Sequence, residues 1–79
     1  MIRLRVAEVL KEKKMSMNKL SQRSEVSYNI VKDIVRNPYR IVTTDTLNRL
    51  ADALEVAATD LVENVTEEQM QQEMEGKKK

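Results

Sequence analysis

The sequence contains no cysteine and no histidine, and both absences narrow the functions it can have. Without cysteine the chain forms no disulfide, and without either residue it lacks the side chains that build ordinary zinc sites. The lack of histidine removes the commonest general base, and a single glycine leaves no phosphate-binding glycine loop. The sequence therefore predicts that the protein is not an enzyme and uses neither a metal nor a cofactor.

Aromatic residues and long apolar runs are also scarce. Phe and Trp are absent, so the core has to be built from Leu, Val, Ile, Ala and Met. No run of 18 apolar residues occurs, so no membrane-spanning helix is expected. Charged residues interrupt the first segment, MIRLRVAEVLKEKK, so no signal peptide is expected. The absence of cysteine fits a reducing compartment, and a cytoplasmic location is predicted. The length of 79 residues corresponds to one domain near the lower size limit for unaided folding.

The net charge of +1 conceals an asymmetry between the two halves of the chain. Residues 1–43 carry ten Lys and Arg against four acidic residues, a net +6. Residues 44–79 carry four Lys and Arg against nine acidic residues, a net −5. The basic half indicates a polyanionic partner. Solvated helix faces that happen to differ in charge are the alternative, and charge alone favours neither.

Apolar residues recur at helical spacing along most of the chain, and capping residues divide it into short segments. Helices are expected at residues 2–13, 16–23, 27–37, 43–56 and 58–63, the last being a single turn. Ser16, Ser27 and Thr43 are the expected N-caps, and Pro38 stops the third helix. No strand is expected, because apolar and polar residues never alternate over four residues with β-branched support. The predicted fold class is all-α: a compact five-helix bundle with a short sixth helix at the C-terminus.

Residues 64–79 form a separate region, an acidic C-terminal helix followed by a basic tail, after a domain of residues 1–63. Thr66 and Gln69 have the spacing of a capping box, and Gly76 is the expected stop. The apolar edge of this helix is thin, since Met70 and Met74 supply most of it. Such a short helix is marginal alone, so we expect the edge to be buried beside residues 61–62 or, more favourably, in a second subunit.

The stretch EVSYNIVKDIVRNP combines a core face with a polar face that is unusually rich in hydrogen-bonding groups. A short turn at residues 24–26 folds the helix of residues 28–36 across the preceding one, with Val26 filling the joint. The polar side chains then lie together on the first turn and a half: Tyr28, Asn29, Lys32 and Asp33. This is the geometry of a helix whose N-terminal half enters the DNA major groove.

Each of these four side chains has a role that it could take against DNA bases. Tyr28 can stack on a sugar or contact a thymine methyl group, and Asn29 has the amide that pairs with adenine N6 and N7. Lys32 can reach guanine or a phosphate. Asp33 repels phosphate but can accept from cytosine N4, or it can orient Lys32 or Arg36. The alternative for each is an ordinary exposed residue on a helix.

A second set of residues has side chains suited to the DNA backbone. Amides and hydroxyls at helix starts, together with Lys and Arg from loops, are the groups that bind phosphates. The candidates are Asn18, Lys19, Ser27, Arg36, Arg40 and Thr43. Ser27 is expected to act first as an N-cap and only second as a phosphate contact. The set as a whole predicts double-stranded DNA as the partner.

Residues 3–62 resemble the Cro/C1 (Xre) type helix-turn-helix domain of phage repressors and small bacterial regulators. Two blocks carry the resemblance, VLKEKKMSMNKLSQRSEVSYNIVKDIVRNP and VTTDTLNRLADALEVAATDLVE. The resemblance implies the phage-repressor fold and a DNA-binding transcriptional regulator, most simply a repressor. One such domain covers a single half-site, so a homodimer is expected.

Three positions depart from the pattern of that family. Glu25 stands where the family usually has glycine in the turn, and Met17 stands where a glutamine often holds a phosphate. Leu10 and Val35 replace an Arg–Glu ion pair, an exchange for apolar residues that a core tolerates. The alternative function is that of an antitoxin or similar interaction protein, with the same fold on DNA and the acidic tail bound to a small protein partner.

Overall fold

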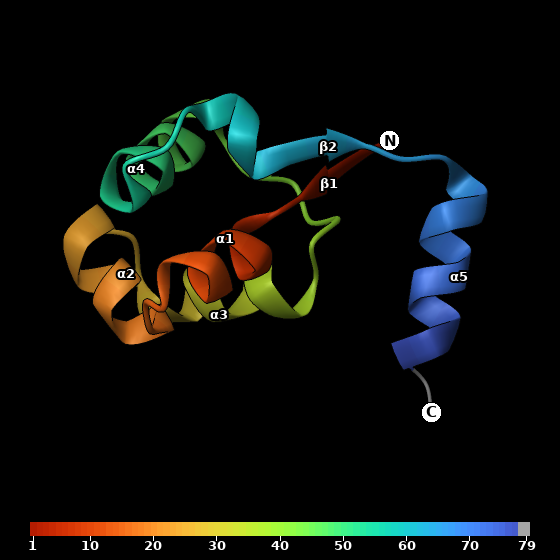
Figure 1. The fold of residues 1–79 in the computed structure, drawn as a ribbon, viewed down its shortest axis with the longest axis horizontal. Helices are drawn as coiled ribbons and strands as arrows, with labels where there is room; N and C mark the ends of the chain where they lie inside the picture. The colour runs from red at the N-terminus through yellow and green to blue at the C-terminus, as the bar shows by residue number, and fades with distance from the viewer. Residues whose placement is uncertain (78–79) are drawn as a thin grey trace.

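The computed structural model describes residues 1–77 of the chain. Its elements follow in the order β1 (Ile2–Leu4), α1 (Val6–Lys13), α2 (Met17–Ser24), α3 (Tyr28–Arg36), α4 (Thr44–Leu54), the 3-10 helix η1 (Ala58–Leu61), β2 (Val62–Asn64) and α5 (Glu67–Lys77). Helices α1 to α4 gather into a bundle, and α5 stands at its side (Figure 1). The all-α prediction is confirmed, since the two strands form only a small addition to the helices. Lys78 and Lys79 of the predicted basic tail lie outside the described residues.

The two short strands correct the expectation that the chain has none. β1 pairs with β2 in antiparallel register, with Arg3 opposite Glu63. The chain start extends the pairing, because the amide of Val65 donates to the carbonyl of Met1 at 2.8 Å. The first helix therefore begins at Val6 rather than at residue 2. A three-residue strand is too short to show alternation, and its stabilising partner lies some sixty residues away, which local pattern does not reveal.

Capping explains where most of the helices begin. The Ser16 hydroxyl accepts a hydrogen bond from the amide of Lys19 at 3.1 Å, and Thr43 accepts one from the amide of Thr46 at 3.1 Å. Both predicted caps are confirmed. Ser27 is the N-cap residue of α3, as predicted, but its side chain makes no capping hydrogen bond. Its carbonyl takes the first bond of α3 instead, from the amide of Val31 at 3.1 Å.

The limits of α5 agree with the prediction at one end only. Thr66 and Gln69 form the reciprocal capping box, with bonds of 3.0 and 3.1 Å. The expected stop at Gly76 is wrong, because α5 extends to Lys77. A glycine in the last turn weakens a helix by about 1 kcal/mol relative to alanine without ending it.

The core is aliphatic, as the composition predicts. Its side chains come from β1, from helices α1 to α4, from the turn before α3 and from η1. The buried residues are Leu4, Val6, Val9, Leu10, Leu20, Val26, Val31, Ile34, Leu50, Ala51, Leu54 and Leu61. Leu10 is buried and Val35 is partly buried against the same core, so the two positions that depart from the family's ion pair are filled by packing. Met15 also packs on the core. The inward face of α3 packs against this core through Val31 and Ile34.

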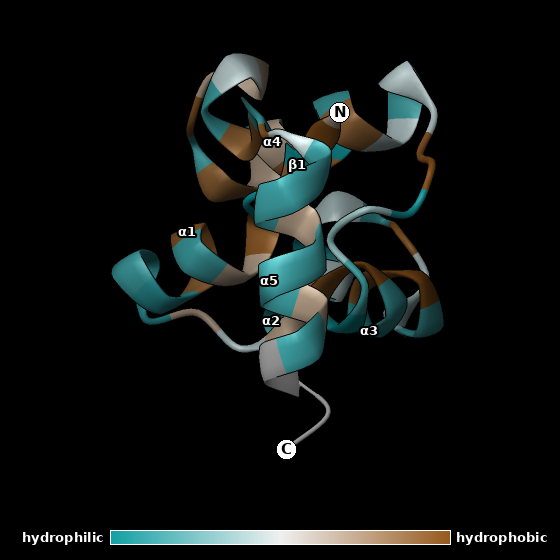
Figure 2. Cartoon of the chain, turned by 90° about the vertical axis from the view of Figure 1, so that its right-hand side faces the viewer, coloured by the Kyte–Doolittle hydropathy of each residue, from teal (hydrophilic) through white to brown (hydrophobic). Residues whose placement is uncertain are grey.

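A polar cluster around Glu73 attaches α5 to the rest of the molecule. Its carboxylate accepts from Arg3 Nε at 2.9 Å and Nη2 at 2.8 Å, and from the Tyr39 hydroxyl at 2.5 Å. The hydrogen bonds to Glu73 raise the pKa of the Arg3 guanidinium against the opposing effect of burial. Burial raises the pKa of Tyr39, and the bond to Glu73 adds to it. Figure 2 shows that α5 is hydrophilic over most of its length, so polar contacts carry much of its attachment.

Candidate nucleic-acid interface

The turn between α2 and α3 is braced by two serines. Ser24 is buried, and its hydroxyl donates to the carbonyl of Leu20 at 2.6 Å and accepts from the amide of Val26 at 3.3 Å. The Ser21 hydroxyl donates to the carbonyl of Val26 at 2.6 Å. Val26 is 7% exposed and fills the joint as predicted. Sequence reasoning missed these hydrogen bonds, although serines two and five residues before Val26 were their signal.

Glu25 adopts the left-handed conformation in this turn, with φ of 60°. A glycine would take that conformation without penalty, whereas a side chain costs roughly 1–2 kcal/mol. The expected departure at this position is therefore accommodated by backbone strain and not by another type of turn. The serine bonds on either side hold the strained residue in place.

α3 presents its polar side chains on the face opposite the core. Val31 and Ile34 are 0% and 1% exposed and pack inward. Tyr28, Asn29 and Lys32 are all exposed. α3 also contacts α1 and α2, which fix its direction (Figure 1). The structure thus brings these three predicted base-contact residues together on one outward face.

Asp33 lies on the same helix but has a partner of its own. Its Oδ2 is 2.7 Å from Arg40 Nη1, in the loop that follows α3. Sequence reasoning considered Lys32 and Arg36 as the cations that Asp33 would orient, and it missed Arg40. The seven-residue separation crosses the helix end, so no helical spacing rule signals the pair. An ion pair this exposed adds little stability, but it fixes the position of Arg40 beside α3.

The predicted backbone-contact residues lie at or near the starts and ends of three helices. Asn18 and Lys19 are exposed in the first turn of α2, and Arg36 is exposed in the last turn of α3. Ser27 is exposed just before α3. Thr43 is exposed before α4, but its hydroxyl is already engaged by the amide of Thr46 and, at 3.0 Å, by the Thr46 hydroxyl.

The described part of the chain contains neither a cluster of metal ligands nor a helix that could cross a membrane. Over residues 1–77 no three His, Cys, Asp or Glu side chains group as metal ligands would. No helix within the same residues has the length and apolar character needed to cross a membrane.

A family of known DNA-binding domains matches most of the chain. Residues 5–67 match the Cro/C1-type HTH DNA-binding domain. No curated protein and no solved structure matches the chain. The match covers α1 to α4 and the β2 strand, and it includes the braced turn and α3. The chain therefore belongs to the Cro/C1-type helix-turn-helix family of DNA-binding domains.

Proposed function

We propose that the protein is a sequence-specific transcriptional regulator, acting as a repressor, that reads the DNA major groove with α3 and binds as a homodimer. The observation that carries this proposal is the division of α3 into two faces. Val31 and Ile34 are buried while Tyr28, Asn29 and Lys32 are exposed on the first turn and a half. A reading helix needs this combination, because its base-contacting side chains require a fixed backbone.

The proposed base contacts are Tyr28, Asn29, Lys32 and Asp33. Asn29 pairs through its amide with adenine, and Lys32 donates to guanine O6 or N7. Tyr28 packs on a thymine methyl group or a sugar. Asp33 accepts from cytosine N4 with one carboxylate oxygen while the other keeps its bond to Arg40. That shared arrangement would make Asp33 and Arg40 act as one unit at the groove.

The proposed backbone contacts are Asn18, Lys19, Ser27, Arg36, Arg40 and Thr43. They lie in α2, in α3 and in the segments that precede α3 and α4, and they all belong to the half of the chain that carries a net +6. Phosphate contacts position α3 in the groove without carrying sequence information. Residues 1–63 would supply all of these contacts, and the acidic side chains of α5 would stay away from the DNA.

A selection of binding sites from random DNA, followed by titration at several salt concentrations, tests the proposal. If a dimer neutralises about six to ten phosphates, its affinity should fall by roughly 10³ to 10⁵ between about 50 and 200 mM salt. The selected sites should contain two half-sites about one helical turn apart. Failure to enrich any sequence, together with a flat salt profile, would contradict the proposal.

An antitoxin is the second candidate, and the exposed acidic residues of α5 favour it. Glu67, Glu68 and Glu75 are all exposed on a helix that has little apolar surface. A basic protein partner would be attracted to that face. Purification from the native cell with a stoichiometric small protein, lost on mutation of these three residues, would support this reading.

A further inference from the structure

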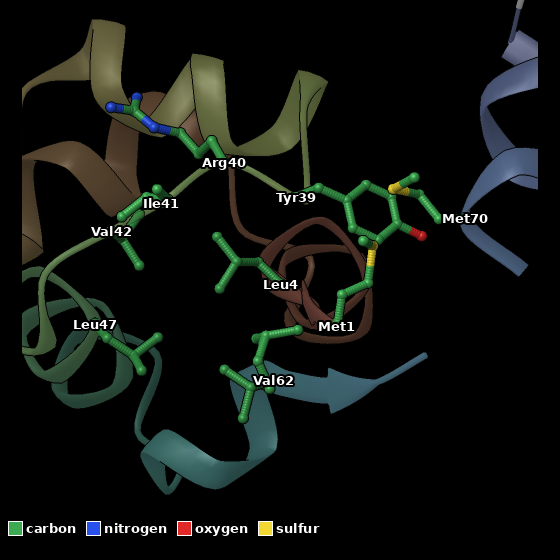
Figure 3. A pocket seen from close by; sticks show the side chains of 10 residues that line it. Met1, Leu4, Tyr39, Arg40, Ile41, Val42, Leu47, Val62 and Met70 are labelled. Atoms are coloured by element: carbon green, nitrogen blue, oxygen red, sulfur yellow. The ribbon is translucent and has the colours of Figure 1, made fainter. Parts of the chain in front are cut away.

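An open apolar hollow lies between the sheet, the loop after α3 and α4. Its volume is about 540 Å³, and Leu4, Val42, Leu47 and Val62 form its walls (Figure 3). Met70 of α5 closes one end beside Tyr39. Most of the side chains that line the hollow are apolar.

The rim of the hollow holds apolar side chains that are unusually exposed. Ile41 is 92% exposed and Ile2 is 57% exposed, and both line the hollow. Single exposed apolar residues are ordinary, but a cluster of them around a cavity marks an interaction surface. Ile41 therefore protrudes directly beside a depression that could receive a side chain of its own type.

The charges of this surface indicate which partner fits it. Two charged groups belong to residues that line the hollow: the Arg40 guanidinium, which pairs with Asp33 at 2.7 Å, and the amino terminus of Met1, which donates to the carbonyl of Val65 at 2.6 Å. The other residues that line the hollow are uncharged, so the surface lacks the cluster of charges that would select a strongly charged peptide. A surface with so few charged groups can meet a second copy of itself with little like-charge repulsion, which favours a self-complementary contact.

We propose that a second copy of this chain docks on this surface about a two-fold axis, with Ile41 of each subunit inserted into the hollow of the other. A protrusion and a depression on one face satisfy each other twice in an isologous contact. The dimer face then adjoins the loop that leaves α3, so pairing would set the spacing of the two reading helices. This inference rests on the proposed function, and it assigns the dimer contact to Ile41 and not to the tail helix.

The size of the surface predicts a weak dimer. Ten residues line the hollow, whereas a standard interface uses about 20–30 residues on each side. Self-association in the absence of DNA should therefore need high protein concentration, and binding to adjacent half-sites should favour it.

Sedimentation equilibrium of the full chain without DNA tests the interface directly. Ile41→Gln keeps the side-chain size and adds no charge, and Met74→Gln is the matched control, because Met74 is exposed but does not line the hollow. The dimer dissociation constant should rise at least about tenfold in Ile41→Gln and stay unchanged in Met74→Gln. Both variants should remain folded, since both residues are exposed.

Failure of the proposed dimer interface can be distinguished from failure of the proposed DNA binding. A wild-type chain that stays monomeric up to about 1 mM would overturn the interface, as would equal dimerisation of the Ile41 variant. Binding of an apolar dye to such a monomer would assign the hollow to a small ligand instead. A dimer that depends on Ile41 but binds no DNA would support the interface and contradict the proposed function alone.

Discussion

Helices α3 and α5 are of similar length, with 9 and 11 residues, but they are held in place by different forces. α3 buries Val31 and Ile34 completely in the aliphatic core. α5 has no buried side chain over residues 67–75, and Glu73 provides its main attachment. Helices this short are marginal alone, so each needs outside support. The comparison shows how packing fixes a helix firmly, whereas a polar attachment leaves it easier to release.

The largest expected effect comes from removing the packing of α3. Ile34→Ala should lower the free energy of unfolding by about 2–5 kcal/mol, because it deletes buried methyl groups and leaves a cavity. Ile30→Ala is the matched control on the same helix, since Ile30 is 37% exposed, and it should change stability by less than about 1 kcal/mol. Urea denaturation of the two variants measures both values. Equal losses would show that α3 is not anchored by its inward face.

Removing the attachment of α5 should have a smaller and local effect. Glu73→Gln weakens the charge-assisted hydrogen bonds to Arg3. A hydrogen bond to a charged group contributes about 1.5–3 kcal/mol to stability. Amide hydrogen exchange should then accelerate over α5 and remain slow in α3. Glu68→Gln alters an exposed residue of the same helix and serves as the control. Slowed or unchanged exchange over α5 in Glu73→Gln would contradict the account of its attachment.

High pH should release α5 in the same way. Burial and the bond to Glu73 raise the pKa of Tyr39 above its usual value of 10.0. The folded state thus favours the protonated phenol, so this contact is fully present below pH 10 and is lost as pH rises through the higher folded pKa. The methyl NMR signals of Met70 and Met74 should shift through that transition. The shift should vanish in Tyr39→Phe and persist in Tyr28→Phe.

The smallest expected effect concerns the turn that leads into α3. Glu25→Gly relieves the left-handed strain but increases the freedom of the unfolded chain, so a net gain of about 0.5–1 kcal/mol is expected. Thermal denaturation measures it, and exchange over α5 should not change. Destabilisation would indicate that Glu25 makes a contribution in the turn that outweighs its backbone strain.

Features that depend on neighbouring residues were predictable from the sequence. The caps at Ser16 and Thr43 follow from side chains that bond amides three residues on. The two faces of α3 follow from helical spacing, because its buried residues recur every three residues. Nearest-neighbour chemistry determines these features almost by itself.

Features that join distant segments were not predictable in the same way. Arg3 and Glu73 are 70 residues apart, and β1 pairs with β2 across most of the chain. Asp33 and Arg40 meet only because the chain turns back after α3. The sequence of each segment permits many such partners, and only the packing of the bundle selects one.

The central claim is that the outward face of α3 reads base sequence, and the affinity of Asn29→Ala for selected and random DNA tests it most directly. The control is a variant that removes a proposed phosphate contact. Lys19→Ala serves here better than Arg40→Ala, because Arg40 is bonded to Asp33 and its loss would disturb both residues. Asn29→Ala should weaken binding to the selected site by about 1–3 kcal/mol and leave random DNA nearly unaffected. Lys19→Ala should weaken both equally. Equal weakening of both DNAs by Asn29→Ala would contradict the claim.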